Sequence, residues 1–139
     1  MSSHSDSSRE HRVPSDTGSS DAECAAVVLD PCAVERVRSR LSGADRLLRT
    51  AGVFSAFADP TRVRILEALG LEELCVCDLA QVCGISQSGV SHQLRLLRDL
   101  RVVAYRRDGN RAVYRLADDH VLTMLGQGFE HADEVIDAK

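Results

Sequence analysis

The fold of this 139-residue chain is indicated most strongly by the stretch Ser86-Gln87-Ser88-Gly89-Val90-Ser91-His92-Gln93-Leu94-Arg95-Leu96-Leu97. Ser86 is a favourable N-cap, and the apolar side chains of Val90, Leu94 and Leu97 recur at helical spacing, which predicts an amphipathic helix. A shorter helix is predicted from about Val76 to Val82, and Gly84 separates the two. Two short helices joined by a tight turn form a helix-turn-helix pattern, whose second helix can enter the major groove of DNA.

A β-hairpin is predicted directly after this recognition helix. Apolar and polar residues alternate over 102–107 and again over 111–116, and the turn Asp108-Gly109-Asn110 lies between the two runs. Alternation on both sides of a glycine-containing turn is the signature of two antiparallel strands. A hairpin in this position is a wing. The chain is therefore expected to be mainly α-helical with a β-hairpin wing.

The local charge supports a role in DNA binding. Between Ser86 and Leu116 there are seven arginines and two acids, although the whole chain has a formal net charge of -4. A solvated arginine face is the alternative interpretation, but polar side chains on a groove-sized helix favour a phosphate-binding surface. The residues expected to contact DNA are Gln87, Ser88, Ser91, His92, Arg95, Arg106, Arg107 and Arg111.

The segments before the helix-turn-helix also read as helices. Asp59-Pro60 has the pattern of an N-cap followed by a first-turn proline, and Gly70 is expected to end the helix that they begin. A loosely amphipathic helix is predicted from Ala33 to about Arg49, and the apolar residues from Val53 onward are expected to continue into a second helix.

Composition limits the remaining organisation. The first twenty or so residues are rich in serine and poor in large apolar side chains, so we expect a disordered N-terminal tail over residues 1–31, in which His4 and His11 have no structural role. Residues 32–139 suffice for one folded domain. The sequence has no apolar run near eighteen residues and no signal-peptide pattern, which predicts a soluble, cytoplasmic protein without a membrane partner. Five cysteines, an odd number, favour a reducing compartment over a disulfide framework.

The C-terminal segment carries four side chains of the type that bind zinc. In a helix over residues 118–137, His120 and His131 would stand roughly 16 Å apart along the axis, too far for one ion. Asp118 and His120 could share an ion with His131 and Glu134 only if two copies of the helix ran antiparallel, which predicts a homodimer. The alternative without a metal is that Asp118 is an N-cap and that His131 and Glu134 form a solvated pair.

The same helix has an apolar stripe suited to packing on another helix. Its members are Val121, Leu122, Leu125, Phe129, Ala132 and Ile136.

Three runs of the chain resemble the ArsR/SmtB family of metal-sensing repressors. They are Ala58-Asp59-Pro60-Thr61-Arg62, the segment from Glu73 to Ala80, and the segment from Ser86 to Leu94. The resemblance, which extends from about residue 45 to the end, implies a winged helix-turn-helix homodimer that binds a twofold-related operator when metal-free and leaves it when metal binds. It also implies that the C-terminal quartet is the zinc site between subunits. The residue matching His131 would reach the backbone carbonyl of Arg101 with its second ring nitrogen.

The cysteines allow a second metal site. Members of the resembled family use a Cys-Val-Cys pair, here Cys75 and Cys77, for soft metals such as cadmium or lead, together with N-terminal cysteines, for which Cys24 and Cys32 are the candidates. Arsenite sensors add a third cysteine where this chain has Ala80. Packing or free thiols remain the alternative, and Cys83 reads as a small buried residue.

The expected function is therefore metal-responsive repression of transcription, with Zn(II) or another divalent or soft metal ion as inducer and double-stranded operator DNA as partner. The alternatives are a thiol-based redox or arsenite-responsive repressor that uses Cys75 and Cys77, and a metal-buffering module. No enzyme is expected, because Ser91, His92 and Asp99 fall on one short helix without an oxyanion loop.

Overall fold

The computed structural model describes residues 27–138, and these fall into two units that divide between Leu41 and Ser42. In the first unit, helix α2 (Pro31–Arg38) begins at a capped turn, where the Asp30 carboxylate accepts a hydrogen bond of 2.8 Å from the backbone N–H of Ala33. None of its side chains is buried. The predicted tail, residues 1–31, lies mostly outside the described residues and stays a prediction.

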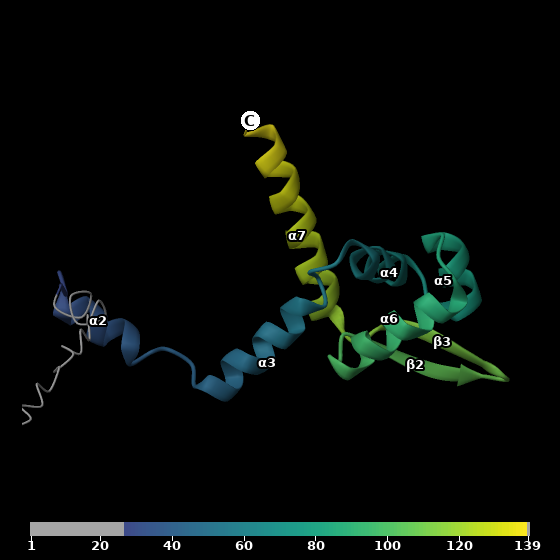
Figure 1. The fold of residues 1–139 in the computed structure, drawn as a ribbon, viewed down its shortest axis with the longest axis horizontal. Coiled ribbons are helices and arrows are strands. Elements are labelled where there is room, and N and C mark those ends of the chain that lie inside the picture. Colours follow the sequence, from purple (N-terminus) through teal and green to yellow (C-terminus); the bar gives the residue numbers. More distant parts are fainter. Residues whose placement is uncertain (1–26, 139) are drawn as a thin grey trace, which may run out of the picture. The chain divides into compact units, whose positions relative to one another are not determined.

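The second unit combines helices with a small sheet (Figure 1). In chain order its elements are α3 (Ala44–Ser55), α4 (Pro60–Leu71), β1 (Leu74–Cys75), α5 (Val76–Cys83), α6 (Gln87–Asp99), β2 (Val103–Asp108), β3 (Arg111–Leu116) and α7 (Asp119–Asp137). The three strands form an antiparallel sheet in the order β1-β3-β2. None of the helices formed by residues 27–138 is long and apolar enough to cross a membrane.

The hydrophobic core lies where α4, α5, α6, the start of β2 and the start of α7 meet. Val90, Leu94 and Leu97 of α6 are 0–1% exposed, as the predicted inward face of the recognition helix requires. Leu79 of α5 packs in the same cluster. The fully buried residues are Ile65, Leu66, Leu79, Val90, Leu94, Leu97 and Val102. This core fixes the helix-turn-helix as one rigid unit.

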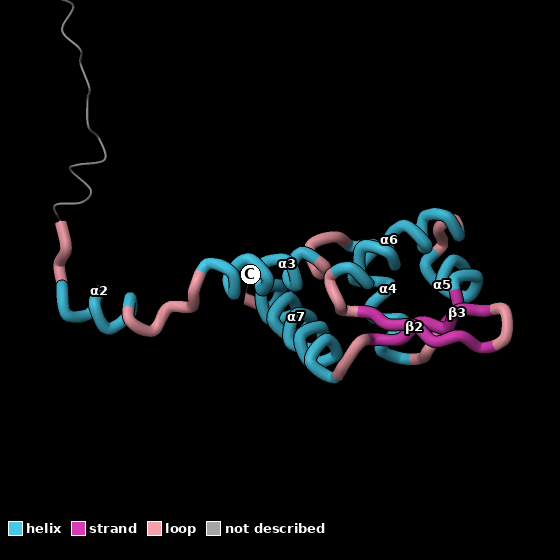
Figure 2. The backbone as a smooth tube through the Cα atoms, turned by 90° about the horizontal axis from the view of Figure 1, so that it is seen from below, coloured by secondary structure: helices cyan, strands magenta, loops and turns pink. Residues whose placement is uncertain are grey.

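The wing is the β2–β3 hairpin, which projects from the helical part of this unit (Figure 2). Asp108 pairs with Arg111, so the turn has two central residues, Gly109 and Asn110. Gly109 has φ 61°, and among the described non-glycine residues only Arg101 has a positive φ. A two-residue turn whose first central residue has a positive φ and whose second has a negative φ suits the right-handed twist of the two strands. Glycine adopts a positive φ without strain.

Three predicted boundaries are wrong. The helix expected from Ala33 to Arg49 is interrupted, because Gly43 is extended (φ -67°, ψ 160°) and serves as the N-cap of α3. Val53 and Phe54 belong to α3 itself rather than to a following helix. Gly70 does not end α4; a Cβ there would lie 3.1 Å from Leu122 Cδ1, so this glycine allows α7 to pack closely on α4. The strand β1 was not predicted, since two residues carry no periodicity.

The chain leaves the recognition helix through a strained turn. The N–H of Arg101 donates to the carbonyl of Arg98 at 2.9 Å, and that of Val102 donates to the carbonyl of Leu97 at 3.0 Å. These two bonds close a Schellman motif in which Arg101, at φ 59°, takes the left-handed position that glycine usually occupies. The turn fixes how the wing leaves α6.

Candidate nucleic-acid interface and metal centre

The exposed face of α6 is the candidate DNA-reading surface. Ser86 caps the helix, because its hydroxyl accepts a hydrogen bond of 3.0 Å from the N–H of Gly89. Gly84, at φ 67°, closes α5 in the left-handed conformation and sets the turn between the two helices. The side chains predicted to face outward are all exposed: Gln87, Ser88, Ser91, His92 and Arg95. The orientation predicted for this helix is confirmed.

The wing presents its arginines on different faces. Arg107 and Arg111 are both exposed near the turn of the hairpin, but the strand register places them on opposite faces of the sheet. Arg106 is the neighbour of Arg107 in β2 and therefore projects to the opposite face of the sheet. There its guanidinium donates to the Glu73 carboxylate from Nε at 3.3 Å and from Nη2 at 3.1 Å. In the absence of DNA, the guanidinium of Arg106 is therefore paired with the Glu73 carboxylate. The sequence did not reveal this contact, because the two residues are 33 positions apart.

Asp118 and His120 lie side by side at the start of α7. Asp118 is the N-cap, since its Oδ1 accepts a hydrogen bond of 3.2 Å from the N–H of Val121. The same oxygen lies 3.5 Å from Nδ1 of His120, and both side chains are more than half exposed. Two ligand atoms of a tetrahedral zinc ion are roughly 3.3 to 3.6 Å apart, given bonds of about 2.0 to 2.2 Å. The cap and the ligand interpretations of Asp118 are therefore compatible.

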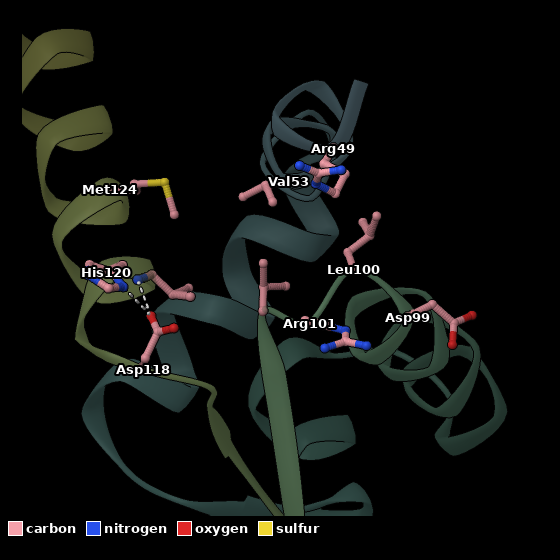
Figure 3. Close-up of a pocket in the computed structure, with 11 residues that line it drawn as sticks. Arg49, Val53, Asp99, Leu100, Arg101, Asp118, His120 and Met124 are labelled. Atoms are coloured by element: carbon pink, nitrogen blue, oxygen red, sulfur yellow. Dashed lines mark hydrogen bonds and ion pairs between the residues drawn. The ribbon is translucent and has the colours of Figure 1, made fainter. Parts of the chain in front are cut away.

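This pair lines a hollow of about 490 Å³ between α3, α7 and the end of α6 (Figure 3). Arg49 and Val53 of α3 form one wall, and Met124 of α7 forms another. Leu100 and Arg101, from the strained turn after the recognition helix, complete the rim together with Asp99 and Val102. The start of α7 and the end of the DNA-reading helix thus share one cavity.

His131 and Glu134 lie further along α7 and are exposed. The two histidines are eleven positions apart, so at about 100° per residue they project only about 20° apart around the helix, on the same side but far apart along it. Within one copy of residues 27–138, no three side chains of histidine, cysteine, aspartate or glutamate come close enough to hold a metal ion. One chain therefore carries two of the four predicted ligands near the start of α7 and the other two in its second half.

The apolar stripe of α7 is divided between two roles. Val121 and Leu125 are buried in the core of their own chain, so the prediction that the whole stripe packs on a separate helix is wrong for these two. Leu122, Phe129 and Ile136 are 47%, 40% and 72% exposed. Phe129 also lines an apolar hollow of about 340 Å³ with Phe54 and Phe57. An exposed apolar surface therefore extends across α3 and the second half of α7.

The cysteines lie in several places. Cys75 ends β1 opposite Val113 of the wing, and its thiol donates a hydrogen bond of 3.2 Å to Asp78 Oδ2. Cys75 and Cys77 line a hollow of about 300 Å³ that the wing residues Asn110 and Arg111 also line. Cys32 belongs to α2, in the other unit, and Cys24 lies outside the described residues.

The fourth described thiol, Cys83, is buried as predicted. Burial raises its pKa, and the charge of Arg64 opposes part of this effect. None of the described cysteines forms a disulfide.

A helix-turn-helix with an exposed second helix and a wing defines the chain as a winged helix-turn-helix protein. A family model described as "Bacterial regulatory protein, arsR family" matches residues 59–105. The chain is 46% identical over 101 residues to a transcriptional repressor SmtB homolog of Synechocystis sp., covering 73% of this chain and 76% of that protein. It is 45% identical over 86 residues to a cadmium resistance transcriptional regulatory protein CadC homolog of Staphylococcus aureus, covering 61% and 71%.

Among solved structures, the homodimeric winged helix-turn-helix DNA-binding domain of a possible ArsR-family regulator from Mycobacterium bovis has a TM-score of 0.66 and 29% identity, over 72% of this chain and 94% of that one. The chain therefore belongs to the arsR family of bacterial regulatory proteins. The family that the sequence motifs resemble is confirmed, and so is the winged helix-turn-helix fold.

Proposed function

We propose that this chain is a transcriptional repressor that binds a twofold-related operator as a homodimer when metal-free and leaves it when Zn(II), or another divalent ion, binds between the subunits. Each site would take Asp118 and His120 from one copy and His131 and Glu134 from the other. The observation that carries the proposal is the 3.5 Å approach of Asp118 Oδ1 to His120 Nδ1 in the hollow that the end of the recognition helix also lines.

The DNA-binding half of the proposal is supported by α6 and the wing. Gln87 and Arg95 are of the types that make paired hydrogen bonds to adenine and guanine edges in the major groove. Arg107 and Arg111, on the exposed hairpin, suit sequence-independent contact with phosphates. Because a twofold operator presents two half-sites, a homodimer would offer one α6 to each.

The metal half is supported by the donor set. Two imidazoles and two carboxylates suit Zn(II), and the spacing of Asp118 and His120 matches two positions of a tetrahedral site. Antiparallel α7 helices would bring His131 and Glu134 of a second copy to this pair. A bound ion would supply a strong link between the two helices, favouring one arrangement of the dimer.

Coupling to DNA is supported by the shared hollow. A histidine arriving at Asp118 and His120 from a second copy would approach the rim formed by Leu100 and Arg101. Hydrogen bonding of its second nitrogen to the Arg101 carbonyl would orient the ring and connect it to the last turn of α6. The left-handed Arg101 makes this turn a strained point at which a small change in backbone angles moves the wing.

The proposal is tested by titrating the apo-protein with Zn(II) while the fluorescence anisotropy of a labelled operator duplex is recorded. We expect zinc to weaken operator binding by about 5- to 150-fold, the range of ordinary allosteric coupling. Sedimentation in the same buffer should show a dimer with and without zinc. Unchanged DNA affinity at saturating zinc, Cd(II) and Pb(II) would exclude release by these three ions and leave a DNA-binding protein with another signal.

A second candidate site is favoured by the placement of Cys75 and Cys77. Thiolates are the preferred ligands of soft metals, and the hollow beside these two residues is also lined by the wing residue Arg111. Cys24 and Cys32 would provide the remaining thiolates. With Ala80 in place of a third local thiol, this arrangement favours cadmium or lead over arsenite.

Cd(II) is accordingly expected to produce an intense ultraviolet thiolate-to-metal absorption that disappears in Cys75→Ser. Cys83→Ala is the matched control, since Cys83 is buried in the core and should leave the band intact. A band of full intensity in Cys75→Ser would reduce the pair to packing residues. Release of DNA by oxidation in a variant whose C-terminal quartet is mutated and whose Cys75 and Cys77 are intact would favour the redox alternative.

Binding rather than catalysis is the activity proposed for this cytoplasmic regulator. Ser91 and His92 are consecutive residues on the exposed face of α6, where they suit contact with DNA. A protein that only buffered metal ions would have no use for an exposed recognition helix beside a wing.

A further inference from the structure

Arg98 continues the exposed row of α6 one turn beyond Arg95, so its sequence position suggests another phosphate contact. The structure places it otherwise. Its guanidinium carbon lies 4.3 Å from the centre of the Tyr105 ring in β2. This is a cation–π contact, in which the positive charge is attracted to the face of the ring. The side chain thus turns from the recognition helix toward the wing.

Tyr105 is in turn held by the second strand of the wing. It pairs with Tyr114 in the β2–β3 register, and the two ring centres are 5.5 Å apart with their planes tilted by 34°. Aromatic pairs directly opposite each other stabilise a hairpin through side-chain packing. Arg98, Tyr105 and Tyr114, which we call the wing bracket, therefore connect the last turn of α6 to both strands of the hairpin.

The wing bracket lies beside the turn that sets the angle between the recognition helix and the wing. Only residues 100–102 separate α6 from β2, and their path turns at the left-handed Arg101. The recognition helix and the wing would contact the duplex at the same time, which requires a defined angle between them. If this angle is not already fixed in the free protein, fixing it during binding costs conformational entropy. A side-chain contact across this turn holds that angle in the free protein.

We propose that Arg98 is a positioning residue: it holds the wing against the recognition helix through Tyr105, and Arg107 and Arg111 make the phosphate contacts. A guanidinium that stacks on the Tyr105 ring is directed toward the wing. The proposal rests on the DNA-binding role of the family and is independent of either metal site.

The two roles of Arg98 make opposite predictions for Tyr105→Leu, which removes the ring but keeps the arginine. If Arg98 positions the wing, this variant should weaken operator binding by about five- to thirtyfold, consistent with the usual strength of exposed cation–π contacts in two protomers. The salt dependence of the affinity should stay that of the unaltered protein. Tyr105→Phe retains the ring face and should bind like the unaltered protein.

Arg98→Gln should weaken binding to a similar extent and should add little in the Tyr105→Leu background, because both changes break the same interaction. Arg107→Gln is the matched control: the slope of log affinity against log salt should fall by about 0.9 for each phosphate that is no longer neutralised. Thermal unfolding of each variant is measured alongside, so that affinities are compared between folded proteins.

These measurements decide the assignment. Wild-type or tighter operator binding by Tyr105→Leu would overturn it, since it would show that freeing Arg98 does no harm. A fall in salt slope in Arg98→Gln as large as in Arg107→Gln would identify Arg98 as a phosphate-binding residue instead. Equal weakening in Tyr105→Phe and Tyr105→Leu would assign the effect to the tyrosine hydroxyl and would equally contradict the positioning role.

Discussion

His131→Ala is expected to leave the metal-free protein dimeric and bound to its operator, while zinc no longer releases it. The change removes one of four proposed ligands and also the imidazole proposed to reach the Arg101 carbonyl. Its side chain is exposed, so the fold should be unaffected. Because allosteric coupling between two sites is typically about 1–3 kcal/mol, its absence is visible as a zinc-independent operator affinity in anisotropy titrations. Asp133→Ala, an exposed neighbour outside the quartet, should respond to zinc normally.

A mixed dimer tests whether the ligands really come from two chains. In a heterodimer of His120→Ala and His131→Ala protomers, one site is without both histidines and the other keeps all four ligands. Each mutant homodimer has two damaged sites. Zinc titration of the purified heterodimer should therefore show one high-affinity site, whereas either homodimer shows none. A heterodimer without such a site would contradict ligation across the interface.

Arg95→Ala is expected to lower operator affinity by about 1–3 kcal/mol for each half-site, because the variant cannot form the paired hydrogen bonds to a base edge. Gln87→Ala should act similarly at a different base pair. Both side chains are exposed on α6, so stability should change little. The measurement is operator binding against a duplex of scrambled sequence, since removing a base-reading side chain reduces the difference between the two.

Two kinds of control separate base contacts from charge. Arg111→Ala should weaken binding to both duplexes and flatten the salt dependence, as expected for a residue that binds phosphate. Arg46→Ala removes an exposed arginine of α3, whose Nη1 donates to the Ser42 hydroxyl, and should leave DNA binding unchanged. If Arg95→Ala and Gln87→Ala bound operator as tightly as Arg46→Ala does, α6 would not be the reading element.

Elements that depend on neighbouring residues could be predicted well. The caps at Ser86 and Asp59 each receive a backbone N–H from three residues ahead, at 3.0 Å in both cases. The glycine-containing turn placed the hairpin, and helical spacing identified the buried side of α6. The separation of His120 and His131 along α7 likewise needs only the helix rise, so the need for a second chain could be argued from the sequence.

Contacts between distant residues were decided by the tertiary structure. The sequence of α7 did not indicate that Val121 and Leu125 are buried in the core of their own chain. The sequence also did not indicate that Gly70 makes room for α7 instead of ending a helix. Two arginines that look alike in the sequence make different contacts: Arg106 pairs with the Glu73 carboxylate, and Arg98 stacks on the Tyr105 ring. Local periodicity and capping reflect backbone hydrogen bonds over three or four residues, whereas these pairings depend on how whole elements pack, and only the folded chain brings them together.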